Sequence, residues 1–174
     1  MPPTEENGWT IADGSVPPAA AWSQVGFWTV GASASLAMIR RRVVAAALRD
    51  RAGPESDQAA VLASASERLS LVCGELAANG LRHGQPPVTV TLARGPESWL
   101  LVVSDREPAR VPRPRPPDLS GGGRLGLPLV RAASRNVGWY VEGATKHVWA
   151  EIGDRPPAGL LRALAPGPVP DHLQ

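Results

Sequence analysis

The longest helical pattern in the sequence covers residues 57–82, and it limits what the rest of the chain can form. Apolar residues recur along it every three or four positions, which is the spacing of a helix with one buried face. In its second half, the side expected to face the core consists of Leu69, Val72, Leu76 and Gly80. The helix is expected to end at Gly84-Gln85-Pro86-Pro87, because proline has no backbone N–H to continue the helical hydrogen bonds.

The other segments give the order β-α-α-β-β-α-β-β. A helix is expected over 35–51, capped by Ser35, and its core face would carry Leu36, Ile39, Val43, Ala47 and Leu48. A third helix is expected over 125–135, with its core side formed by Leu125, Leu129 and Ala132. Strands are expected at 27–30, 88–92, 99–103, 139–141 and 147–152. Adjacent strand pairs favour a mostly antiparallel, mixed sheet with helices on one face, which is an α+β two-layer sandwich.

Composition divides the chain into three parts. Residues 1–24 are rich in Pro, Ala, Ser and Gly and are expected to form a mobile arm. Residues 25–153 contain the predicted helices and strands and form one domain, and residues 154–174 form a Pro-rich tail. Inside the domain, residues 105–123 combine prolines with a run of glycines, which predicts a long loop acting as a lid or binding loop.

The charge balance and the cysteine content limit the class of protein. Lys plus Arg is 18 and Asp plus Glu is 16, so the net charge of +2 gives no basis for binding nucleic acid. The single cysteine, Cys73, cannot form an intramolecular disulfide and is expected to be a small core residue. No stretch approaches the roughly 18 apolar residues of a membrane span, and the N-terminus has no apolar run. We therefore expect a cytoplasmic protein with no membrane partner.

Three polar residues lie along one edge of the long helix. Glu75, Asn79 and His83 are spaced i, i+4 and i+8, which places them within about 80° of one another around the helix. Carboxylate and amide oxygens are hard ligands of the kind that Mg²⁺ prefers. The alternative is a solvated polar edge of an amphipathic helix, and spacing alone favours that alternative.

Two further features lie after the apolar strand. Asp105 follows the strand directly, where a carboxylate at the rim of an apolar pocket accepts a hydrogen bond from an amino group such as that of adenine. Asp also commonly opens turns, so this signal is weak alone. The run Gly121-Gly122-Gly123-Arg124-Leu125-Gly126-Leu127 leads into a helix, and glycines before a helix N-terminus let the backbone approach a phosphate. No Gly-Lys-Ser/Thr follows, so the run is not a P-loop.

The sequence from Glu75 to Gly84 closely resembles the N-box of the GHKL ATPases, the group of gyrase, histidine kinases and heat-shock chaperone ATPases. Asp105, the loop and the Gly-rich helix start resemble the next two boxes of that group, in the same order. Within the group, the chain looks most like the stand-alone domains of bacterial anti-sigma-factor serine/threonine kinases. The resemblance covers roughly residues 25–152 and implies the Bergerat ATP-binding fold.

The resemblance also implies a role for each matching residue. Asn79 would bind Mg²⁺, Glu75 would be the general base, and Asp105 would hold the adenine amino group. The lid backbone would contact the phosphates of ATP at Gly123, Arg124, Gly126 and Leu127. No lysine is expected near the site, so the phosphate charge would be neutralised by Mg²⁺, backbone N–H groups and Arg124 or Arg82. The implied partners are a sigma factor and an anti-anti-sigma-type protein, and a homodimer is left open.

Two positions depart from the pattern of the group. The group has Asp-x-Gly-x-Gly where this chain has Asp105-Arg106-Glu107-Pro108-Ala109, so Glu107 brings bulk and charge where the backbone would approach the nucleotide ring. The lid has one more residue between its glycines than the common form. Two functions follow: an ATP-dependent protein kinase, favoured by Glu75, and an inactive ATP-fold module that sequesters a regulator, favoured by the missing glycines.

Overall fold

The computed structural model describes residues 17, 22–31, 36–50, 56–110, 112 and 126–157, which form three helices and five strands. The strands are β1 (Ser23–Val30), β2 (Val88–Arg94), β3 (Ser98–Asp105), β4 (Asn136–Glu142) and β5 (Thr145–Gly153). The helices are α1 (Leu36–Asp50), α2 (Ser56–His83) and α3 (Gly126–Ala133). The expected order of elements is confirmed, and β1 begins before the expected residue 27.

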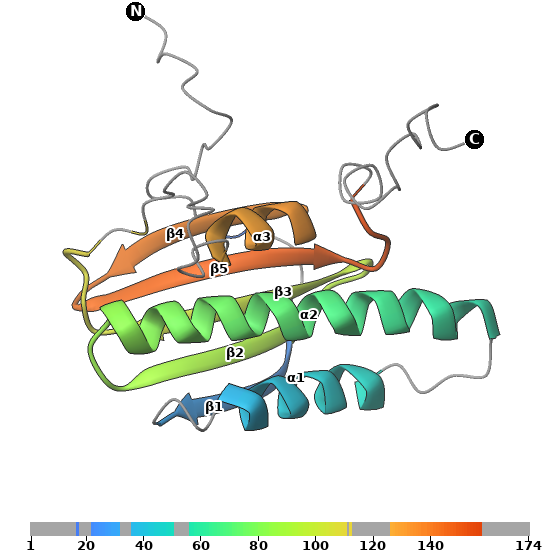
Figure 1. The fold of residues 1–174 in the computed structure, drawn as a ribbon, viewed down its shortest axis with the longest axis horizontal. Helices are drawn as coiled ribbons and strands as arrows, with labels where there is room; N and C mark the ends of the chain where they lie inside the picture. Colours follow the sequence, from blue (N-terminus) through green and yellow to red (C-terminus); the bar gives the residue numbers. More distant parts are fainter. Residues whose placement is uncertain are drawn as a thin grey trace, which may run out of the picture.

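The strands form one sheet in the order β1-β2-β3-β5-β4, and all four neighbouring pairs are antiparallel. The three helices lie on one face of this sheet, with α2 across its middle (Figure 1). The structure is thus the expected α+β two-layer arrangement. The sheet is antiparallel throughout the part of the chain described here, so the expected mixed character is not seen there.

The core lies between α2 and the sheet. Leu69, Val72 and Leu76 of α2 are at most 2% exposed, as their spacing predicts. They pack with the inward residues of the central strands, which include Val90, Leu92, Trp99, Leu101 and Ile152. Cys73 is also fully buried, and burial raises the pKa of its thiol to about 12, so it is the small apolar core residue expected.

Arg68 fixes the middle of α2 to the end of β5. Its side chain is only 5% exposed, and its Nη2 donates hydrogen bonds to the carbonyl oxygens of Gly153 (2.7 Å) and Asp154 (3.0 Å). Asp154 in turn accepts two hydrogen bonds of 2.9 Å from Arg94 of β2. The long helix is therefore held to the sheet by directed hydrogen bonds as well as by apolar packing.

Some expected core positions are wrong. Leu48 of α1 is 45% exposed and Leu129 of α3 is 36% exposed, and Ala132 is exposed as well. The α3 residues that enter the core are Val130 and Ala133, because the helix lies on α2 and β4 through a face rotated from the one expected. Leu125 and the cap Ser35 lie outside the described residues.

The face of the sheet away from the helices carries a smaller apolar cluster. Its buried members are Ala93, Leu100 and Trp149, which belong to β2, β3 and β5. Trp22, Val102 and Tyr140 pack against them. Trp22 precedes β1 and lies on Gly95, where an added Cβ would come within 2.6 Å of its ring.

Candidate functional site

Glu75 of α2 and Gly126 at the start of α3 are brought together by the packing of these two helices. A Cβ built on Gly126 would overlap Glu75 Oε2 and lie 3.4 Å from Glu75 Cδ. A glycine is therefore required for the carboxylate to lie against the backbone at this point. Two features far apart in the sequence, the N-box carboxylate and the last glycine of the Gly-rich segment, thus meet at one place.

Asn79 lies one helical turn beyond Glu75 and is half-buried. Its Oδ1 accepts a hydrogen bond of 3.3 Å from Nη2 of Arg82, whose Nε donates to the carbonyl of Ala78 at 3.2 Å. Asn79 Oδ1 is the oxygen expected to bind Mg²⁺. A metal ion would have to displace this weak, exposed contact, which a flexible arginine side chain allows.

Asp105 ends β3 and is almost fully buried, at 2% exposure. Its Oδ1 accepts a hydrogen bond of 2.8 Å from the backbone N–H of Glu107, and its Oδ2 lies 3.2 Å from Nζ of Lys146. Lys146 is 4% exposed and is the residue of β5 that pairs directly with Asp105. The expectation that no lysine lies near the site is therefore wrong, since the only lysine of the chain neutralises Asp105.

The loop after β3 is held against the end of α2. Gly84 lies on Asp105, where an added Cβ would come within 2.6 Å of the aspartate Cβ. The N–H of Arg106 donates to the carbonyl of Gln85 at 2.9 Å, and Nε2 of Gln85 donates to Glu107 Oε2 at 2.8 Å. Glu107, which replaces a glycine of the family pattern, is thus fixed by the segment that follows the N-box.

The remaining predicted residues divide into two groups. Leu127 is half-buried and packs against the main core, next to Gly126. Gly123 and Arg124 lie outside the described residues. The structure therefore brings Glu75, Asn79 and Gly126 to one region around the C-terminal half of α2, and it places Asp105 beside the end of that helix.

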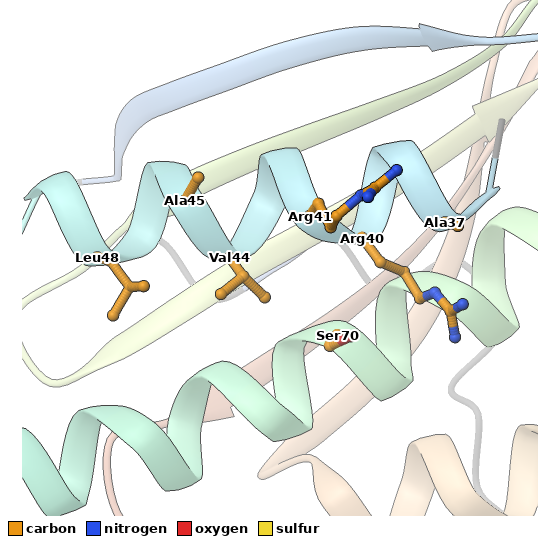
Figure 2. Close-up of a pocket in the computed structure, with 7 residues that line it drawn as sticks. All are labelled: Ala37, Arg40, Arg41, Val44, Ala45, Leu48 and Ser70. Carbon is orange, nitrogen blue, oxygen red and sulfur yellow. The ribbon is translucent and has the colours of Figure 1, made fainter.

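A separate shallow hollow lies on the outer side of the helical layer. It has a volume of about 480 Å³ and lies between α1 and α2 (Figure 2). Six residues of α1 and one of α2 line it: Ala37, Arg40, Arg41, Val44, Ala45, Leu48 and Ser70. None of the predicted site residues is among them.

The described residues show neither a cluster of metal ligands nor a membrane-spanning helix. Among the described residues there is no group of three His, Cys, Asp or Glu side chains arranged to hold a metal ion. That finding leaves the proposed Asn79 ligand open, because an amide is not one of those groups. No helix in the described part of the chain has the length and apolar character needed to cross a membrane.

The comparisons with known proteins support an ATPase-like fold. The family model described as a histidine kinase-like ATPase domain matches residues 32–152, which is well over half of the chain. The match includes α1, α2, α3 and the strands β2 to β5, apart from Gly153 at the end of β5. No curated protein matches the sequence.

Proposed function

The chain belongs to the histidine kinase-like ATPase domain family, and from that premise we propose that it is an ATP-binding regulator that phosphorylates a partner protein on serine or threonine. The partner would be an anti-anti-sigma-type protein, and a sigma factor would be bound as well. The observation that carries the proposal is the contact between Glu75 and the backbone at Gly126. That contact joins a candidate base to the helix N-terminus expected to lie at the phosphates.

The residues present fit magnesium and a triphosphate. Gly126 has no side chain, so its backbone is uncovered beside Glu75. Asn79 provides an amide oxygen, a ligand suited to Mg²⁺, one helical turn from Glu75. Mg²⁺, when bound, would supply charge neutralisation of the phosphate oxygens. The N-terminus of α3 adds backbone N–H groups with a favourable dipole.

Glu75 would act as general base in the transfer step. Its carboxylate accepts the proton of the partner's hydroxyl group while the hydroxyl oxygen bonds to the γ-phosphorus. The bond from that phosphorus to the β–γ bridging oxygen breaks, ADP leaves, and the partner keeps the phosphoryl group. Glu75 is half-buried, so part of the residue is accessible to solvent.

A second candidate function is a binding module that transfers nothing. The buried Asp105–Lys146 pair favours it, because the carboxylate expected to recognise adenine already has a cationic partner. In this alternative the nucleotide fold would only present a surface to a regulator.

Glu75→Gln distinguishes the two functions. The substitution keeps the shape of the side chain and removes the base, so Mg-ATP affinity should change little while phosphoryl transfer or slow ATP hydrolysis falls by about 100-fold or more. Affinity is measured by calorimetric titration and transfer with labelled ATP. Equal turnover in variant and wild type removes Glu75 from the mechanism, and ATP binding without any turnover in the wild type favours the binding module.

A further inference from the structure

The ammonium group of Lys146 contacts the end of β3 and the loop that follows it. Its Nζ lies 3.2 Å from Asp105 Oδ2 and donates hydrogen bonds to the carbonyl oxygens of Glu107 (3.1 Å) and Arg110 (2.9 Å). An ammonium group has three N–H donors, so these three oxygens use all of them. The lysine therefore joins the end of β3 to the loop that follows it.

Asp105 is closed to a ligand in this arrangement, because both oxygens have partners and the carboxylate is buried. Oδ1 accepts from the N–H of Glu107 at 2.8 Å, Oδ2 faces Lys146, and Gly84 packs on the carboxyl carbon. Only 2% of the residue is exposed. A base amino group could reach this carboxylate only if Lys146 or the loop of residues 106–110 moved away.

We propose that Lys146 is the residue that sets base specificity at this site, and that it makes the site nearly indifferent to the amino group of adenine. The inference rests on the proposed nucleotide binding and concerns only how the base is read. Affinity would then come from the triphosphate and its magnesium, at Glu75, Asn79 and the start of α3.

The chemistry of donors and acceptors supports this assignment. The 6-amino group of adenine is a donor and carries partial positive charge, as the ammonium of Lys146 does. Both would compete for the same carboxylate, and the lysine carries a full charge and makes a charge-assisted contact. A neutral residue at position 146 carries no full charge, so it would compete less strongly than lysine with the base amino group for Asp105.

The test compares three probes, each with magnesium, by calorimetric titration: ATP, purine riboside triphosphate and inorganic tripolyphosphate. Purine riboside triphosphate differs from ATP only in lacking the 6-amino group. We expect the wild type to bind the two nucleotides within about threefold of each other. In Lys146→Gln the preference for ATP should rise to about tenfold or more, which is the usual effect of a hydrogen bond to a charged group.

Lys146→Arg is the matched control, because it keeps the positive charge and should keep the small wild-type ratio. The ratio of two affinities is the readout, since a purely structural role for Lys146 would change both affinities together. If Lys146→Gln does not fold, the wild-type ratio still decides. A wild-type preference of about tenfold or more for ATP overturns the inference, as does a folded Lys146→Gln variant with an unchanged ratio. Failure of all three probes to bind the wild type or either variant overturns the proposed function, and the inference with it.

Discussion

Lys146 and Asp105 form a charged pair inside the protein, where each depends on the other. Both side chains are at most 5% exposed, so neither charge is solvated if its partner is lost. Removing one member of such a pair is far more harmful than replacing both by neutral groups, because an uncompensated charge stays buried. At the scale of single residues, this pair is the most sensitive polar feature of the site.

Lys146→Met should lower the free energy of unfolding by about 3–5 kcal/mol, because it leaves the Asp105 carboxylate buried with one backbone donor. The double variant Asp105→Asn/Lys146→Met should be more stable than Lys146→Met alone, because it contains no buried charge at this point. Urea denaturation of the four proteins in the cycle measures the coupling. A double variant whose destabilisation equals the sum of the single ones would contradict the pairing.

His147 lies next to Lys146 on the opposite face of the sheet. Its Nδ1 is hydrogen-bonded to Ser104 Oγ at 2.8 Å, and its ring stacks on Tyr140 with centroids 4.6 Å apart. Burial lowers the pKa of His147 below its ordinary value of 6.5, although Glu142 and Asp105 act in the opposite direction. The folded protein therefore favours the neutral imidazole.

A lowered histidine pKa makes stability depend on pH in a defined direction. Between the ordinary value and the lowered one, the unfolded chain binds more protons than the folded chain, so stability falls as the pH drops through this window. The unfolding free energy of His147→Gln should lack this pH dependence. The unfolding free energies of both proteins are measured from about pH 7.5 to about pH 5. If the wild type becomes more stable relative to His147→Gln as the pH falls, the pKa of His147 is raised and not lowered.

At the scale of helices and strands, the packing of α2 against α3 determines the position of Glu75. At Gly126 the backbone of one helix touches the end of a side chain on the other, so an added methyl group would displace a flexible carboxylate and leave the helices in place. The position therefore controls where Glu75 points more than how stable the fold is.

Gly126→Ala should reduce phosphoryl transfer by about tenfold or more while changing the unfolding free energy by only about 1 kcal/mol, since alanine is the better helix residue. Gly74→Ala is the matched control, because the three atoms nearest to its Cβ all belong to the flexible side chain of Arg40, with Cδ at 3.1 Å. Turnover and urea unfolding are measured for both. Equal loss of turnover in both variants would show that the Glu75–Gly126 contact has no special role.

For the whole molecule, binding and folding are linked. Mg-ATP that binds only the folded state should raise the melting temperature. At 100 times its dissociation constant, it should stabilise the folded state by about 2.7 kcal/mol. Asn79→Ala should remove the part of this shift that depends on Mg²⁺. Thermal unfolding with ATP, with and without magnesium, provides the measurement. An unchanged wild-type melting curve at millimolar Mg-ATP would refute ATP binding.

Features that depend on local spacing could be predicted from the sequence. The period of α2 identified Leu69, Val72 and Leu76 as core, and alternation identified the strands. The pairing of Lys146 with Asp105 could not be predicted, because it depends on the register between β3 and β5. Leu48 and Leu129 were misassigned because their helices carry apolar residues on more than one side, and only tertiary packing selects the buried one.

The central position of β3 has a consequence for local opening of the chain. β3 is hydrogen-bonded on both sides, to β2 and β5, and lies beneath α2, so its amide protons should exchange with solvent only in near-global unfolding. Residues 106–110 continue directly from it and are bonded to the rest of the fold mainly through Gln85 and Lys146. Asp105 therefore stands at the boundary between the most protected backbone of the sheet and a loop held by a few hydrogen bonds, so the amide protons of residues 106–110 should exchange faster than those of β3.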